Sequence, residues 1–137
     1  MSDAADIAVG ILRGMGYANA YSIAPSAAVC AEPIVLVSKG WEREARFADG
    51  SERGREGVST IVCCDSVSDA RATAFAVERD LRRVVWNAVD GVRIVSVDTD
   101  MPRSLGRDSS GRWLWGFTLS CVVVRNFDRQ DEIGPRR

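Results

Sequence analysis

Apolar residues recur at intervals of three and four near the N-terminus, which predicts a helix over residues 3–15. Ser2 or Asp3 can cap the start of this helix, and Gly14 or Gly16 can end it. The apolar face consists of Ala4, Ile7, Ala8, Ile11, Leu12 and Met15.

The clearest helical pattern covers residues 65–88. Ser66 and Asp69 form a capping box at its start. Its arginines fall mostly away from the apolar face, as expected for a helix that covers a core. That face consists of Ala70, Ala74, Val77, Leu81, Val84 and Val85.

Strand-like patterns occupy much of the remaining chain. Residues 17–33 are loop-like with a short extended piece, residues 48–57 are a mobile hairpin connection, and residues 100–111 are a turn-rich link. Asp90 and Gly91 form a turn. Strands are predicted over residues 34–39 with an alternating continuation over 41–47, and over 58–64, 92–99 and 112–125.

This order of elements predicts an α+β fold. We expect an antiparallel or mixed sheet of four to five strands with two helices packed on one face, in the order α-β-β-(β)-α-β-β. Residues 1–125 then form one domain, and residues 126–137 form a loose polar C-terminal tail.

The last predicted strand is apolar on both sides. Trp113 and Trp115 share one face because they are two residues apart, whereas Leu114, Val122 and Val124 lie on the other. Helices on one side of a sheet bury only one face. The pattern therefore predicts either a bulge at Gly116 or burial of the second face against another subunit.

Composition and charge exclude some classes of function. The 137 residues are 46% hydrophobic and 27% charged, with a formal net charge of −1. This balance is typical of a soluble globular domain and disfavours a protein that grips nucleic acid mainly through phosphates. Lys39 is the only lysine, so the positive charge is nearly all arginine. No apolar run is long enough to span a membrane, and the N-terminus lacks a basic leader region.

Catalytic chemistry finds little support in the residues. The chain has no histidine, no phosphate-binding loop and no dinucleotide-binding fingerprint. Asp98 and Asp100 make an incomplete shell for a cation. A zinc site would need all four thiolates. Cys63, Cys64 and Cys121 lie in apolar runs, and together with Cys30 they are predicted to be free thiols packed as small hydrophobic residues. We expect no enzyme activity, no catalytic residues, no metal and no cofactor.

The run from Asp90 to Arg125 resembles the small tail-completion proteins of long-tailed bacteriophages, which are the tail terminators and the minor capsid proteins encoded beside them. The similarity comprises a strand after the second helix, a link of the form P-x-x-LGRD-x-x-GRW, and a long final strand. The matching residues are Pro102, Leu105, Gly106, Arg107, Asp108, Gly111, Arg112 and Trp113. The order of helices and strands agrees with this family, whereas residues 17–33 have no matching motif.

The resemblance implies a non-enzymatic structural protein of a phage or prophage. Members form a ring, commonly of six subunits, that caps the tail tube or joins tail to head. The implied partners are further copies of the chain, the major tail tube protein and a head-side neck protein, with DNA only passing through the lumen. The implied location is the host bacterial cytoplasm during assembly and then the virion tail or neck. The alternative is a small α+β adaptor or nucleic-acid-binding module without catalytic activity.

Candidate interface residues fall in two stretches. The stretch 48–57 is too charged to be expected in a core, so it is either a solvated tip or a segment ordered by a neighbouring subunit or the tube. Arg107 and Asp108 either pair locally or pair across subunits, and we favour the second. The candidates for contact with a subunit or the tube are Asp49, Arg53, Arg55, Glu56, Arg103, Arg107, Asp108, Arg112, Trp113 and Trp115.

Overall fold

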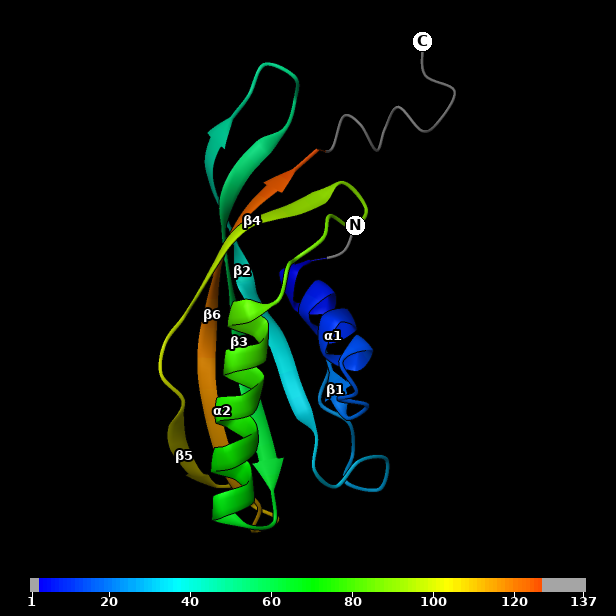
Figure 1. The fold of residues 1–137 in the computed structure, drawn as a ribbon, viewed down its shortest axis with the longest axis vertical. Helices are drawn as coiled ribbons and strands as arrows, with labels where there is room; N and C mark the ends of the chain where they lie inside the picture. Colours follow the sequence, from blue (N-terminus) through cyan, green and yellow to red (C-terminus); the bar gives the residue numbers. More distant parts are fainter. Residues whose placement is uncertain (1–2, 127–137) are drawn as a thin grey trace.

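The computed structural model describes residues 3–126 and contains two helices and six strands (Figure 1). The predicted tail lies outside the described residues from position 127 onward. In chain order the elements are α1 (Ala4–Gly14), β1 (Ala20–Tyr21), β2 (Ile34–Arg46), β3 (Glu52–Cys64), α2 (Val67–Arg83), β4 (Val92–Thr99), β5 (Arg103–Arg107) and β6 (Trp113–Arg125).

The strands form one mixed sheet in the order β1-β2-β3-β6-β4, and β5 also pairs with β6. β1 and β2 are parallel, and all the other pairs are antiparallel. The α+β class and the mixed sheet are therefore confirmed. The strand count exceeds the prediction because the turn-rich link contains β5. This strand was missed because it has only five residues and includes Gly106.

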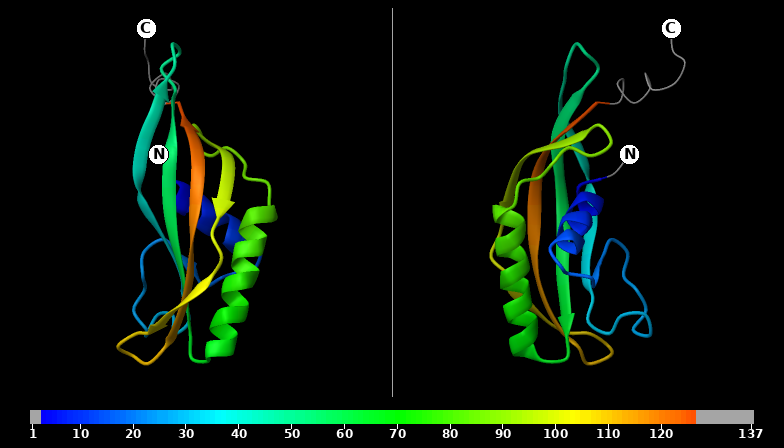
Figure 2. Two further views of the ribbon diagram at one scale, coloured as in Figure 1. Left: turned by 90° about the vertical axis from the view of Figure 1, so that its left-hand side faces the viewer. Right: turned by 45° about the vertical axis from the view of Figure 1, so that its right-hand side comes forward.

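Both helices contribute to a single core on one face of the sheet (Figure 2). Asp3 caps α1 by accepting a hydrogen bond from the Asp6 amide at 2.8 Å, and Ser66 caps α2. Fully buried leucines fill the space between helices and sheet: Leu12, Leu36, Leu81 and Leu119. Neither helix of residues 3–126 covers the opposite face, and we call it the open face.

The second helix is shorter than predicted. It ends at Arg83, and Val85, expected on its buried face, is 77% exposed. Beyond the helix, the Trp86 indole N–H donates to the Leu81 carbonyl oxygen at 2.9 Å. This bond satisfies one of the carbonyls that a helix end leaves without an intrahelical partner.

The prediction of a mobile connection over residues 48–57 is wrong for most of that stretch. Residues from Glu52 onward belong to β3, which pairs with β2 on one side and β6 on the other. Because side chains alternate along a strand, Glu52 and Glu56 are buried on the helix side while Arg53 and Arg55 are exposed. Charged residues are thus compatible with this strand because each buried carboxylate meets an arginine.

The bulge at Gly116, one of the two alternatives for the apolar pattern of β6, does not occur. The register between β3 and β6 runs without a shift from Glu52↔Arg125 to Cys64↔Trp113. A Cβ on Gly116 would lie 2.8 Å from the Thr60 backbone oxygen and 2.9 Å from Leu105 Cδ1, so glycine permits close packing here. The register shifts lie instead against the neighbouring strands, at Ile94/Ser96 in β4 and Ser104/Gly106 in β5.

Candidate interaction surfaces

The sequence-predicted interface residues lie at two ends of the sheet. One group belongs to the β2–β3 hairpin, which extends beyond the helices in Figure 1. The other belongs to β5, β6 and the turn between them. The pairs Glu52↔Arg125 and Cys64↔Trp113 are twelve residue steps apart along β3, which corresponds to about 40 Å along the strand. The structure therefore does not bring the ten residues into one site.

At the hairpin end, Asp49 and Arg53 line a hollow of about 380 Å³ on the open face, which we call the arginine hollow. Arg53 and Arg93 both lie opposite Val124 in the register, one on each side of β6. Among the described residues no carboxylate forms an ion pair with either arginine. The lining residues are Phe47, Asp49, Ser51, Arg53, Arg93, Val95 and Val124.

The Asp49 carboxylate is held by the turn. It accepts hydrogen bonds from the Ser51 hydroxyl at 2.5 Å and the Ser51 amide at 2.9 Å. The bond from the hydroxyl, followed by the bond from the amide, lowers the pKa of Asp49 from its ordinary value. Asp49 is therefore ionised at neutral pH, and it shapes the tip that borders the hollow.

The other two hairpin candidates have partners within the chain. Arg55 pairs with Glu44 at 2.9 Å on the surface. Glu56 is 1% exposed and pairs with Arg125 at 2.9 Å. The expectation that Glu56 belongs to a charged stretch excluded from the core is therefore wrong, because Arg125 neutralises it from 69 residues away.

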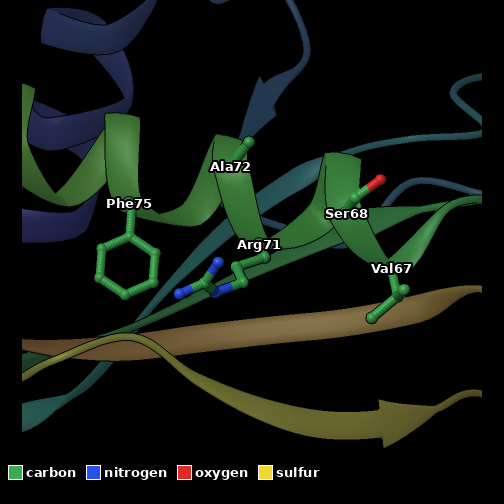
Figure 3. A pocket seen from close by; sticks show the side chains of 5 residues that line it. All are labelled: Val67, Ser68, Arg71, Ala72 and Phe75. Atoms are coloured by element: carbon green, nitrogen blue, oxygen red, sulfur yellow. The ribbon is translucent and has the colours of Figure 1, made fainter.

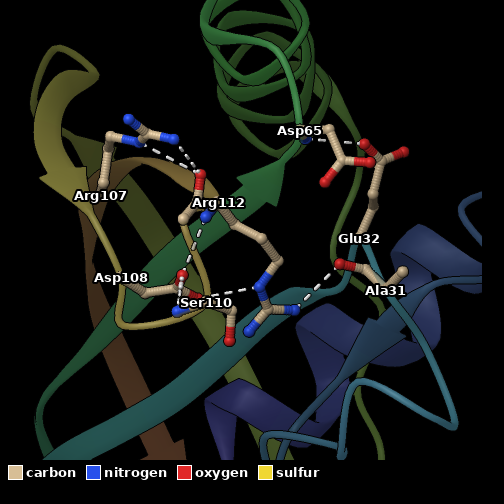
Figure 4. Close-up of polar contacts among 8 residues, drawn as sticks. Ala31, Glu32, Asp65, Arg107, Asp108, Ser110 and Arg112 are labelled. Atoms are coloured by element: carbon tan, nitrogen blue, oxygen red, sulfur yellow. Dashed lines mark hydrogen bonds and ion pairs between the residues drawn. The ribbon is translucent and has the colours of Figure 1, made fainter.

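The turn between β5 and β6 is held by its own polar contacts (Figure 4). Asp108 pairs with Arg112 at 2.8 Å and accepts hydrogen bonds from the Arg112 and Ser110 amides. Arg107 donates to the Gly111 carbonyl oxygen at 3.0 Å rather than to Asp108. Within residues 3–126, the LGRD and GRW motifs thus have a local structural role, and pairing of Arg107 or Asp108 across subunits stays a prediction.

Arg112 also connects the turn to the loop before β2. Its guanidinium donates to the Ala31 carbonyl oxygen at 2.9 Å. In the same loop, Glu32 accepts a hydrogen bond from the Asp65 amide at 2.9 Å. The sequence provided no role for residues 17–33, and the part of this stretch between β1 and β2 is thus attached to the sheet end by backbone and side-chain contacts. Arg103, the remaining arginine of this group, lies 3.6 Å from Asp100 on the surface.

Asp108 should make the stability of the protein sensitive to acid. Hydrogen bonds from the Arg112 amide, and further contacts with the Arg112 side chain, lower the pKa of Asp108. A carboxylate with a lowered pKa in the folded state stabilises the fold above its unfolded pKa of about 3.9, and this stabilisation is lost as the pH falls through the folded value. Asp108→Asn should therefore be less stable than wild type at about pH 7 and approach it below about pH 4. Urea unfolding across this range measures the effect, and a constant difference would contradict it.

Both tryptophans of β6 lie beneath arginines. The Arg107 guanidinium carbon is 4.9 Å from the centre of the Trp113 ring, and that of Arg71 is 5.9 Å from Trp115. Such stacking stabilises the pair and orders the guanidinium. Trp113 and Trp115 are both partly buried against the core, so they serve the core and the surface together.

Arg71 and Phe75 were not predicted as site residues. They line a groove of about 440 Å³ along the first half of α2, and both side chains point from the helix toward the sheet (Figure 3). The groove is also lined by Val67, Ser68 and Ala72. The spacing of Arg71 and Phe75 places them on one helix face, but their contact with Trp115 depends on packing between distant segments.

The open face exposes apolar side chains on several strands. Val37, Val95 and Leu105 are 47%, 52% and 43% exposed, although Val122 is buried. Val95 in β4 and Leu105 in β5 are the extra residues where the register of these strands against β6 shifts. The sequence predicted either a bulge in β6 or burial of its second face against another subunit. Since β6 has no bulge against β3, burial against another subunit is the alternative that fits these exposed apolar side chains.

The three buried cysteines, Cys63, Cys64 and Cys121, are not activated thiols. Burial raises the pKa of Cys64 to about 11 and that of Cys121 to about 12, and it also raises the pKa of Cys63. These thiols are protonated at neutral pH.

Within residues 3–126, no three histidine, cysteine, aspartate or glutamate side chains gather as metal ligands would. No helix in this part of the chain is long and apolar enough to cross a membrane.

The described surfaces suit protein contact. They combine arginine, aromatic and aliphatic side chains, which are the residue types that dominate binding energy in interfaces.

Comparison with models of known protein families yields no match, and a search of curated proteins finds no significant relative.

Proposed function

We propose that the chain is a non-enzymatic structural protein of a phage or prophage that caps the tail tube or joins the tail to the head as an oligomeric ring. The observation that carries the proposal is the open face, which combines exposed apolar residues with the arginine hollow. Exposed apolar area of this kind favours a partner. The resemblance around Pro102–Trp113 supplies the identity of the assembly.

The proposed partners are further copies of the chain, the major tail tube protein and a head-side neck protein. The protein assembles in the host bacterial cytoplasm and ends in the virion tail or neck. DNA passes through the lumen of the ring without being gripped, in keeping with the net charge of −1. No catalytic step is part of this function.

Electron microscopy of tail tubes tests the proposal. The tail tube protein of the phage or prophage that encodes this chain is polymerised in vitro with and without the purified protein. We expect added protein to occupy one end of each tube and to shorten the tubes, because a capped end no longer accepts subunits. Tubes of unchanged length with bare ends would contradict the proposal and favour an adaptor role instead.

Point substitutions suit this assay better than deletion of residues 50–55. Residues 52–55 pair with both β2 and β6, so their deletion would damage the sheet as well as any contact surface. Arg53→Ala changes only the surface, because Arg53 is exposed and forms no ion pair with the described residues. Arg83→Ala, an exposed arginine at the end of α2, is the matched control.

A further inference from the structure

The arginine hollow has features that specify what it binds. Arg53 and Arg93 are exposed on either side of Val124, and neighbouring strands in a sheet are about 4.8 Å apart. The backbones of Arg53 and Arg93 are thus about 10 Å apart, with the strand of Val124 between them. Phe47 and Val95, which line the same hollow, are 44% and 52% exposed. A complementary surface would present a carboxylate next to apolar side chains.

The chain carries such a surface on its helix side. A second hollow, of about 280 Å³, is lined by Asp6, Ile7, Gly10, Ile11, Asn87 and Val89. Asp6 is exposed in the first turn of α1, and Val89 is 38% exposed. Among the described residues no arginine or lysine pairs with Asp6. We call this surface the α1 hollow.

The two hollows lie on opposite sides of the sheet at similar positions along its length. The Ala4 amide at the start of α1 donates to Glu56 at 3.1 Å, which fixes the level of this helix end on β3. Arg53 is three residues from Glu56 on the same strand, or about 10 Å away along it. Copies placed side by side with parallel orientation would therefore bring the arginine hollow of one against the α1 hollow of the next.

We propose that the arginine hollow of one copy binds the α1 hollow of a second copy, with Asp6 of one subunit facing Arg53 and Arg93 of the other. The contact joins two different surfaces, so repeated copies close into a ring if the rotation between them allows it. A nucleic acid is a poorer occupant, because phosphate binding needs an array of cations and the hollow includes Asp49 at its rim. The inference specifies the subunit contact that the proposed ring requires, and in that sense it rests on the proposed function.

Charge reversal tests the contact in solution, without tail tubes. Sedimentation velocity of the full chain should show a concentration-dependent oligomer. Arg93→Glu and Asp6→Arg should each weaken self-association at least about tenfold, because each places like charges together. The double variant, with both substitutions, restores an opposite-charge pair and should recover much of the loss.

Matched controls separate this contact from general charge effects. Asp69→Arg changes the same position in the first turn of α2 and has the same effect on a helix dipole, so it should leave the oligomer intact. Arg83→Glu is the control for Arg93→Glu. Thermal unfolding of each variant confirms that the compared chains are folded.

Three results would overturn the inference. They are a wild-type chain that is monomeric at its highest soluble concentration, single variants that associate like wild type, and folded single variants whose combination fails to recover association. Failure of the two proposals is distinguishable. If the protein is monomeric but still caps tubes, the subunit contact alone is overturned, and the arginine hollow is assigned to the tube protein. If the protein forms the oligomer but does not bind tube ends, the proposed function alone is overturned.

Discussion

Glu56→Ala is expected to lower the free energy of unfolding by about 3–5 kcal/mol, as is typical when one partner of a buried ion pair is removed. The Glu56 side chain is 1% exposed and that of Arg125 is 14% exposed. The substitution leaves the Arg125 guanidinium without its carboxylate in a largely buried position. It also removes the acceptor for the Ala4 amide and the Ser38 hydroxyl.

Urea unfolding measures this loss, with Glu44→Ala as the control. Glu44 pairs with Arg55 at the surface, where the side chains are 36% and 56% exposed. Exposed pairs of this kind contribute about 0–1 kcal/mol. Equal losses for the two variants would show that the Glu56 network does not stabilise the hairpin end of the fold.

Leu119→Ala is expected to lower the free energy of unfolding by about 2–5 kcal/mol, because it leaves a cavity in the core as well as removing apolar burial. Leu119 is fully buried in β6, and it lies opposite Val58 in the register with β3. Leu105→Ala makes the same chemical change at a side chain that is 43% exposed. Thermal or urea unfolding should therefore show a much smaller loss for Leu105→Ala, and comparable losses would contradict the placement of Leu119 in the core.

Elements formed by local patterns could be predicted from the sequence. The 3.6-residue period of apolar residues predicted both helices. This local pattern is sufficient because the apolar face of each helix packs against the core, whichever strand it contacts. The end of α2 was placed too late because Val84 and Val85 continue the apolar pattern beyond Arg83, where the helix ends. Alternation in β6 placed Trp113 and Trp115 on one face correctly, since the register with β3 has no shift there.

Features that depend on distant segments could not be predicted. Glu56 appeared to belong to a charged loop, since nothing near it in sequence reveals the ion pair with Arg125. Arg93 was likewise overlooked, because its place beside Arg53 follows from the register of β4 and β3 against β6. The family-like motif in the LGRD turn led us to expect recognition of a neighbour, but the motif did not reveal the ion pair that Asp108 forms with Arg112 inside the turn.

The contacts of Glu56 also bear on whether the order of elements along the chain could be changed by circular permutation. Its carboxylate contacts Ala4 at the start of the first helix and Arg125 at the end of the last strand. Within residues 3–126, the first helix therefore begins and the last strand ends at the same carboxylate. Domains with adjacent ends commonly tolerate circular permutation when the new break falls in an exposed turn. A linker joining the two ends, with the chain opened in the turn at Ser109–Ser110, would keep all six strands and both helices uncut.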